Sequence, residues 1–318
     1  MKLQLVQLRL EADDIVSLVL RDPSGTELPT WSAGSHVPVT LPSGLVRQYS
    51  LCGPQDDRHT YTVAVLRVDR GRGGSREIHD RLRVGDIVEV GQPRNDFGLV
   101  PAEHYLFTAG GIGITPILAM LDEVSVRNPP PASVRVVYGA RSRSAMAFVE
   151  RLRRLDDIDL QLVAQDTDGL PDFAAAIAAS PPGTQMYSCG PPAMLSAVTQ
   201  LGQERPDISV HIERFSGAEQ ASSVSDGEAD DFEVELVRTG ITVKVSNDRS
   251  VLDAVLEAAP DTPFSCTSGF CGTCETKVLG GEVDHRDELL TDAERAANQT
   301  MMICVSRAKA GSRLRLDL

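Results

Sequence analysis

The chain has 318 residues, which is too long for one ordinary domain and fits two or three domains of roughly 100 residues each. Its 31 basic and 45 acidic residues give a net charge of −14, which makes nucleic acid and anionic membrane surfaces unfavourable partners. No apolar run is long enough to span a membrane, and the first residues alternate like a strand instead of forming a signal-peptide core. The sequence therefore predicts a multidomain cytoplasmic protein.

Residues 1 to about 100 predict a small antiparallel β-barrel. Short runs of alternating apolar and polar residues are separated by turn sequences such as Asp22-Pro23-Ser24-Gly25. Many short strands joined by tight turns are typical of a barrel. The expected strands are Leu3–Leu10, Ile15–Arg21, Val37–Leu41, Val46–Leu51, Tyr61–Leu66 and Ile87–Val90.

Two segments of this barrel have the chemistry to bind a flat, phosphorylated cofactor. Arg47-Gln48-Tyr49-Ser50 ends a strand and offers a guanidinium for phosphate, a ring for an aromatic cofactor and a hydroxyl. Gly73-Gly74-Ser75 precedes a helix expected to begin near Arg76, and its backbone amides could bind an anion. Each segment also has an ordinary explanation, an exposed strand end in the first case and a flexible basic turn in the second.

Residues 103 to 215 change to an alternation of strands and helices. Such an alternation predicts a parallel sheet covered by helices. The expected strands are Tyr105–Ala109, Val134–Tyr138, Ile158–Ala164, Gln185–Cys189 and Ile208–Glu213. The expected helices open at Pro116 and cover Met146–Leu155, Asp172–Ala179 and Ala193–Gln200.

Two glycine segments follow strands of this sheet. In Gly110-Gly111-Ile112-Gly113-Ile114-Thr115-Pro116, backbone could approach a pyrophosphate, with Thr115 capping the helix and Pro116 at its first position. Cys189-Gly190-Pro191 ends a later strand and should face the same crevice. The first segment departs from G-x-G-x-x-G, and no acidic residue follows the second strand. The alternatives are a glycine turn without ligand and a Cys189 that is only a small buried hydrophobe.

After a small, acidic linker, residues from 232 onward form a third region. The expected strands are Phe232–Val237, Ile241–Val245, Thr276–Leu279 and Leu314–Leu318, with a helix over Val251–Ala258.

Four cysteines of this region, Cys266, Cys271, Cys274 and Cys304, have the C-x4-C-x2-C…C spacing of a plant-type [2Fe–2S] cluster. Gly269 and Gly272 would let the ligand loop curl around the cluster. Disulfides or a zinc site are the alternatives, although a four-cysteine zinc site usually shows two C-x2-C pairs. A cluster of this kind accepts one electron at a time, so the rest of the chain should supply a donor.

In this order the motifs resemble the ferredoxin–NADP reductase superfamily, and specifically the phthalate dioxygenase reductase family of FMN, NAD(H) and [2Fe–2S] reductases. Val283-Asp284-His285-Arg286-Asp287 is also close to the family pattern, whereas Thr267-Ser268 stands where relatives often carry a charge. The resemblance implies a multidomain fold: an FMN-binding antiparallel β-barrel at 1–101, an NAD(H)-binding α/β domain at 102–216, a linker at 217–231 and an α+β, β-grasp plant-type ferredoxin domain at 232–318.

The resemblance also implies roles for individual residues. The residues expected at FMN are Arg47, Gln48, Tyr49, Ser50, Ala64, Val65, Leu66, Gly73, Gly74, Ser75 and Phe215. Those expected at the nicotinamide nucleotide are Gly111, Gly113, Thr115, Gly190 and Pro191. Ser50, Cys189 and Phe215 are expected to be catalytic, and Cys266, Cys271, Cys274 and Cys304 to ligate the metal.

The function implied is electron transfer from NADH through FMN and the cluster to a Rieske-type oxygenase. NADPH is the less favoured coenzyme, although Arg141 and Arg143 could meet its 2′-phosphate. Delivery to a cytochrome P450 and a redox-sensing flavoprotein are the alternatives. Family members of this design often work as monomers.

Overall fold

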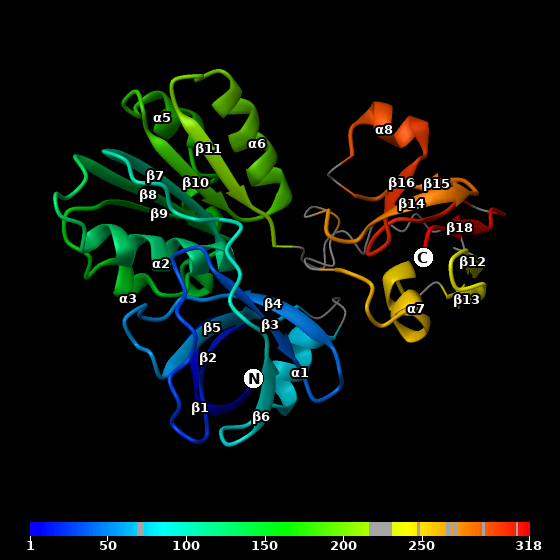
Figure 1. Cartoon of the computed structure of the whole chain (residues 1–318). Helices are drawn as coiled ribbons and strands as arrows, with labels where there is room; N and C mark the ends of the chain where they lie inside the picture. Colours follow the sequence, from blue (N-terminus) through cyan, green and yellow to red (C-terminus); the bar gives the residue numbers. More distant parts are fainter. Residues whose placement is uncertain are drawn as a thin grey trace. The chain divides into compact units, whose positions relative to one another are not determined.

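The computed structural model describes residues 1–68, 73–215, 231–246, 249–264, 269, 272–287, 290–309 and 311–318. The chain divides into two compact units, Met1–Phe215 and Ser216–Leu318 (Figure 1). Every strand expected from the sequence is present, with ends shifted by at most two residues. No helix in these ranges is both long and apolar enough to cross a bilayer.

The first unit begins with the expected antiparallel barrel, drawn in blue to cyan in Figure 1. Its elements are β1 (Lys2–Ala12), β2 (Ile15–Arg21), β3 (His36–Thr40), β4 (Val46–Ser50), β5 (Thr60–Leu66), α1 (Gly74–Arg81) and β6 (Ile87–Val90). The strand order is β4-β3-β6-β1-β2-β5, and a bridge between Leu51 and Val63 joins the two edges. Leu3, Leu5 and Leu20 point inward and are fully buried, so the alternation seen in the sequence fills the barrel.

A parallel sheet follows in the same unit. Its strands are β7 (His104–Gly110), β8 (Ser133–Ala140), β9 (Asp159–Ala164), β10 (Gln185–Cys189) and β11 (Ser209–Glu213), in the order β11-β10-β7-β8-β9. Helices α2 (Ile114–Ser125) and α3 (Val149–Leu152) pack on one face, and α5 (Phe173–Ala178) and α6 (Pro192–Gln203) on the other. Successive strands are added on one side of β7 up to β9 and then on its other side from β10. Open α/β sheets bind ligands at such a switch point, which here lies between β7 and β10.

One expected helix of this sheet is wrong. The sequence predicted a helix over Met146–Leu155, but only Val149–Leu152 is α-helical. Phe148 has a φ of 61°, a left-handed conformation that interrupts a helix. The preceding residues instead form the short 3₁₀ helix η2 (Arg143–Ala145), whose first turn is capped by the Ser142 hydroxyl.

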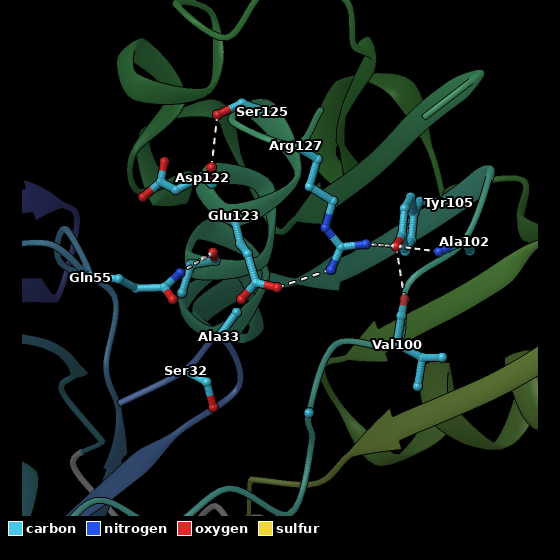
Figure 2. A network of polar contacts seen from close by, with 12 residues as sticks. Ser32, Ala33, Gln55, Val100, Ala102, Tyr105, Asp122, Glu123, Ser125 and Arg127 are labelled. Atoms are coloured by element: carbon cyan, nitrogen blue, oxygen red, sulfur yellow. Dashed lines mark hydrogen bonds and ion pairs between the residues drawn. The ribbon is translucent and has the colours of Figure 1, made fainter. Parts of the chain in front are cut away.

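The barrel and the parallel sheet share one apolar core. Buried Ile15, Ala64 and Phe97 of the barrel belong to the same cluster as Ile114 and Ile117 of α2. Polar contacts add to this packing, because the Gln55 side chain donates a hydrogen bond to the carbonyl of Ala119 in α2, 3.0 Å away (Figure 2). The two parts therefore form one body.

A network of polar contacts also holds the segment between barrel and sheet (Figure 2). The Tyr105 hydroxyl accepts the backbone N–H of Ala102 and donates to the carbonyl of Val100, each at 2.8 Å. Arg127 donates to the same hydroxyl and pairs with Glu123 at 2.9 Å. These contacts fix the connecting segment against the start of β7.

The second unit contains a mixed five-stranded sheet and a helix. Its elements are β12 (Phe232–Leu236), β13 (Ile241–Val245), α7 (Val251–Ala258), β14 (Glu275–Gly280), β16 (Thr300–Met302) and β18 (Leu314–Leu316), with the sheet order β13-β12-β18-β14-β16. Parallel pairing of β12 with β18 gives the expected β-grasp arrangement. The helix α7 begins with a capping box between Ser250 and Asp253.

The sequence reasoning missed several short elements of this unit. They are β15 (Val283–Asp284), α8 (Asp292–Ala297), β16 and β17 (Arg307–Ala308). The strands have only two or three residues, which is too short for an alternation to be read. A signal for α8 was available, because Thr291 and Glu294 have the S/T-x-x-E pattern of a capping box.

Candidate functional site

The end of β4 combines a buried hydroxyl with a cationic side chain. Ser50 is 4% exposed, and its Oγ has no hydrogen-bond partner among the residues that the structure describes. Burial raises the pKa of the Tyr49 phenol, so this ring stays neutral. Gln48 and Arg47 are half-buried on the same strand. A buried hydroxyl without a protein partner suits a ligand with hydrogen-bonding ring atoms.

The glycine loop expected to bind phosphate lies against Arg47. A Cβ placed on Gly74 would lie 2.8 Å from Arg47 Nε, so only glycine permits this approach. Gly73 has a φ of 83°, and α1 begins at Gly74, two residues earlier than the sequence suggested. The Ser75 hydroxyl accepts the N–H of Val68 at 3.1 Å. The guanidinium and the helix N-terminus, segments far apart in the sequence, therefore form one positively polarised corner that fits a phosphate.

The expected flavin strand, Ala64-Val65-Leu66, ends β5. Ala64 and Val65 are buried on opposite sides, because Ala64 belongs to the core shared with the parallel sheet and Val65 to the barrel interior. Leu66 is half-buried. The Val65 side chain therefore points away from the sheet, and only its backbone can face a ligand there. The same strand contacts the 3₁₀ turn η1 (Gly111–Gly113) that follows β7.

The two glycine segments of the sheet touch each other. A Cβ on Gly113 would lie 2.2 Å from the carbonyl oxygen of Cys189, and one on Gly110 would lie 2.5 Å from Pro191 Cδ. Gly111 adopts a φ of 54°, and Gly190 is buried. The carboxyl ends of β7 and β10 therefore come together with bare backbone, as close approach to a pyrophosphate requires.

The expected cap of α2 is wrong. The helix begins at Ile114, and its N-cap is Gly113 without any side-chain hydrogen bond. Buried Thr115 instead donates its hydroxyl to the carbonyl of Ile112 at 3.0 Å, and Pro116 occupies the third helical position. The 3₁₀ turn runs directly into the helix, so no side-chain cap is needed. A proline is tolerated there because the first four helical N–H groups have no partner within the helix.

A buried carboxyl that the sequence reasoning missed lies beside Cys189. Glu213 pairs with Cys189 in the register of β10 and β11, and its Oε2 is buried without a hydrogen-bond partner among the described residues. Burial, with a smaller contribution from Asp96, raises the pKa of Glu213 to about 8. Burial also raises the pKa of the fully buried Cys189 thiol, and Glu213 adds to this. Both groups are therefore protonated at neutral pH.

Phe215 lies two residues beyond β11, on the same sheet edge as Glu213, and is half-buried. No sequence pattern singled out Glu213, because a glutamate at a strand end is ordinarily exposed. Its position two residues before Phe215 was the available signal.

Two of the four expected metal ligands converge in the second unit. Cys274 is 3% and Cys304 is 4% exposed, and their sulfur atoms lie 3.2 Å apart. This distance exceeds the roughly 2 Å of a disulfide bond. Cys266 and Cys271 lie outside the described residues. Two buried thiols this close are a donor set suited to one iron of a [2Fe–2S] cluster.

A buried carboxyl group lies near Gly269, the described residue between the expected ligands Cys266 and Cys271. Asp287 has a fully buried side chain that accepts the N–H of Leu290 at 2.8 Å and lies 3.6 Å from His285 Nδ1 and 3.8 Å from Arg295. A Cβ on Gly269 would lie 3.0 Å from Asp287 Cα. Gly269 therefore lies closely against the backbone of this aspartate.

Two protein families match separate parts of the chain. Residues 234–309 match the family described as 2Fe-2S iron-sulfur cluster binding domain, which decides between the cluster and the disulfide or zinc alternatives. Residues 98–206 match the family described as Dimethylamine monooxygenase subunit DmmA-like, N-terminal domain.

Similarity to individual proteins extends over the whole chain. Vanillate O-demethylase oxidoreductase from Pseudomonas sp. (strain HR199 / DSM 7063) is 42% identical, with 98% of each chain covered. The solved structure of phthalate dioxygenase reductase, titled a modular structure for electron transfer from pyridine nucleotides to [2Fe–2S], is 36% identical with a TM-score of 0.88. It covers 100% of this chain and 98% of its own.

A third match concerns a longer protein. An intact type IV self-sufficient cytochrome P450 monooxygenase is 44% identical over all of this chain, which spans 41% of that protein, with a TM-score of 0.70. On the full-length similarity, the barrel, the nucleotide sheet and the cysteine spacing together, the chain belongs to the phthalate dioxygenase reductase family of flavin and iron–sulfur oxidoreductases.

Proposed function

We propose that this chain is the reductase component of a Rieske-type oxygenase system. As a member of its family it is an oxidoreductase that passes electrons from NADH through FMN and a [2Fe–2S] cluster to a partner oxygenase. One observation carries the proposal: β5, which ends in the expected flavin strand, contacts the Gly111–Gly113 turn of the nucleotide sheet. The segments expected to hold FMN and NADH thus meet inside one body.

On the FMN side, we assign the phosphate to Arg47 and to the Gly73-Gly74-Ser75 loop. The closeness of Gly74 to Arg47 supports this assignment. The buried Ser50 hydroxyl would donate to the flavin ring, which accounts for its lack of a protein partner. Bound FMN supplies the conversion between a two-electron hydride donor and a one-electron acceptor.

On the nicotinamide side, Gly111, Gly113, Thr115 and the Gly190-Pro191 pair would bind the nucleotide. The Cys189 thiol and the Glu213 carboxyl lie at the ends of adjacent strands and are protonated at neutral pH, so they add no negative charge beside the hydride donor. The Phe215 ring would cover the flavin ring until the nicotinamide displaces it. The close contact of the two glycine segments supports a single binding crevice.

We retain the domain limits 1–101, 102–216, 217–231 and 232–318 and a monomeric state as parts of this proposal. In the second unit, Cys266, Cys271, Cys274 and Cys304 would ligate the iron atoms, and the convergence of Cys274 and Cys304 supports this assignment.

The cofactor content is tested by a visible spectrum of the purified protein before and after anaerobic NADH. A brown protein that bleaches, contains two irons per flavin and gives a rhombic low-temperature EPR signal is the expected result. A colourless preparation or zinc in place of iron would contradict the proposal.

The partner is tested by reconstitution, because a cytochrome P450 is a second candidate acceptor. The match to the self-sufficient P450 favours that candidate, whereas the similarity to vanillate O-demethylase oxidoreductase favours an oxygenase component. We expect NADH-driven reduction of a purified Rieske oxygenase to exceed that of a P450. The reverse order would assign the chain to a P450 system, and slow NADH oxidation with both acceptors would favour a redox sensor.

A further inference from the structure

The carboxyl ends of β8 and β9 bring two arginines and two aspartates together. Arg141 and Arg143 follow β8, and Asp166 and Asp168 lie on α4 (Gln165–Asp168), the short helix that follows β9. The backbone N–H of Asp166 donates to the carbonyl of Arg141 at 3.0 Å, so α4 lies directly against the end of β8. This corner has equal numbers of positive and negative side chains.

The Asp168 carboxylate is held by its own helix. It accepts the backbone N–H of Ala164 at 2.9 Å and the Thr167 hydroxyl at 3.1 Å. The Ala164 hydrogen bond is the largest of several contacts that lower the pKa of Asp168. These two hydrogen bonds orient the carboxylate, and together with the smaller contribution of Arg143 they favour its ionised form.

This fixed carboxylate binds one of the two arginines. Arg143 Nη2 lies 2.8 Å from Asp168 Oδ2, and this contact is both a hydrogen bond and an ion pair. Arg141 differs, since its exposed guanidinium makes no ion pair or hydrogen bond with any residue in the described ranges. Of the two arginines that follow β8, the fold therefore pairs Arg143 with a carboxylate and leaves Arg141 exposed.

The location matters for the choice of coenzyme. In doubly wound sheets the adenosine ribose lies beyond the end of the strand that follows the glycine turn, which is β8 here. An acidic side chain there favours the free 2′-hydroxyl of NADH, and an arginine accommodates the 2′-phosphate of NADPH. The chain has no acid on β8 itself, but Asp168 supplies one from the neighbouring strand end.

We propose that the Asp168–Arg143 pair determines coenzyme choice, because it withholds Arg143 from a 2′-phosphate and presents a carboxylate that repels one. This inference rests on the proposed function of the sheet as an NADH site. It makes Asp168 a specificity-determining residue and Arg143 a latent phosphate ligand.

The main test replaces Asp168 with asparagine, which keeps the side-chain shape and removes the charge. Calorimetry on the holoprotein would compare binding of adenosine 2′,5′-bisphosphate with that of 5′-AMP. We expect the ratio of the two dissociation constants to shift about tenfold toward the bisphosphate in Asp168→Asn, and kcat/KM for NADPH relative to NADH to rise similarly. In Asp168→Asn combined with Arg143→Gln, the gain should disappear.

Two further variants make the test specific. Asp166→Asn removes the same charge from the same helix without touching Arg143, and should shift the ratio by less than about twofold. Arg143→Gln alone should likewise change bisphosphate binding by less than about twofold, because the wild-type arginine is already neutralised. A tenfold loss in Arg143→Gln would mean that Arg143 already binds phosphate and would overturn the proposal.

The remaining outcomes separate this inference from the proposed function. If Asp168→Asn leaves the ratio unchanged, or shifts it no more than Asp166→Asn, while NADH still reduces the protein, only the coenzyme inference fails. If the wild-type protein binds neither adenine nucleotide and NADH does not reduce it, the proposed function fails and the inference fails with it.

Discussion

The two units build their sites in different ways. In the unit Met1–Phe215, bare backbone at glycine turns and one buried hydroxyl form a candidate site whose shape is set by the packing of two large apolar cores. In the unit Ser216–Leu318, the described part of the site is a pair of buried thiols beside the buried Asp287. If these thiols ligate iron as proposed, the stability of this site would be coupled to metal binding, as it is in small metal domains. The first candidate site is thus formed by the fold, and the second would depend on its cofactor.

The largest effect should come from removing one cysteine that is proposed to ligate the cluster, which would interrupt electron transfer through the second unit. Cys304→Ser removes one thiolate, so iron content should fall and reduction of cytochrome c should drop about 100-fold or more, because electrons no longer reach a one-electron carrier. NADH-dependent ferricyanide reduction should persist, since the first unit is untouched. Iron analysis and steady-state kinetics measure both. Cys52→Ser, which removes a buried sulfur from the first unit, is the control and should retain its iron. Unchanged cytochrome c reduction in Cys304→Ser would refute the route.

A change of pH between about 4.5 and 8 should act on the first unit through Glu213. Its raised pKa means that the folded state binds more protons than the unfolded state between the ordinary value of 4.5 and about 8. Stability should therefore decrease as pH rises through this window, by roughly 5 kcal/mol in total, and then level off. In Glu213→Gln this decrease should be absent. Urea unfolding at pH 6 and pH 9 measures it, and equal slopes in both proteins would contradict the assignment.

The close contact between the Gly110–Gly113 turn and the Cys189–Gly190 backbone should be disrupted by a single added methyl group. Gly113→Ala places a Cβ 2.2 Å from the Cys189 carbonyl, so the turn must shift and kcat/KM for NADH should fall about 100-fold. Gly98→Ala is the matched control, because its Cβ would meet no atom closer than 3.7 Å. Stopped-flow reduction of the flavin by NADH compares the two. Equal rates in both variants would show that the contact between the glycine segments has no role.

The smallest effect concerns the hydroxyl of Ser50. Ser50→Ala should slow flavin reduction about tenfold while FMN content stays intact, because one hydrogen bond to the ring is lost. The flavin-free protein should instead gain about 1 kcal/mol of stability, since a buried group without a partner is removed. Ser17→Ala is the control: its hydroxyl donates to Glu11, so the rate should be unchanged and stability should fall. A flavin-free Ser50→Ala protein of lower stability would show that the hydroxyl has a protein partner.

Much of this organisation follows from local sequence patterns. Alternation predicted the strands of both units, and cysteine spacing predicted a cluster that the family match confirms. These features depend on residues close together in the chain or on a fixed ligand geometry. The role of Ser50, Cys189 and Phe215 at the cofactors stays a prediction.

Other features depended on contacts between distant segments. The burial of Glu213 arises only when β11 pairs with β10, and the ion pair of Arg143 requires the end of β8 to meet α4. The interrupted helix has a similar cause, because nothing in the sequence around Phe148 marks a left-handed residue. Thr115 does not cap α2, because a 3₁₀ turn that no residue type specifies uniquely leads directly into the helix.

The core shared by barrel and parallel sheet limits how the protein can be re-engineered. Cutting the chain near residue 101 would separate apolar side chains that pack in one cluster, such as Phe97 and Ile114. Each fragment would then expose an apolar surface that favours aggregation. A cut before Asp231 crosses none of the apolar clusters found among the described residues, since the described apolar residues from Phe232 onward form a cluster of their own. Hybrid reductases with exchanged ferredoxin domains should thus be joined before Asp231, with the unit Met1–Phe215 kept intact.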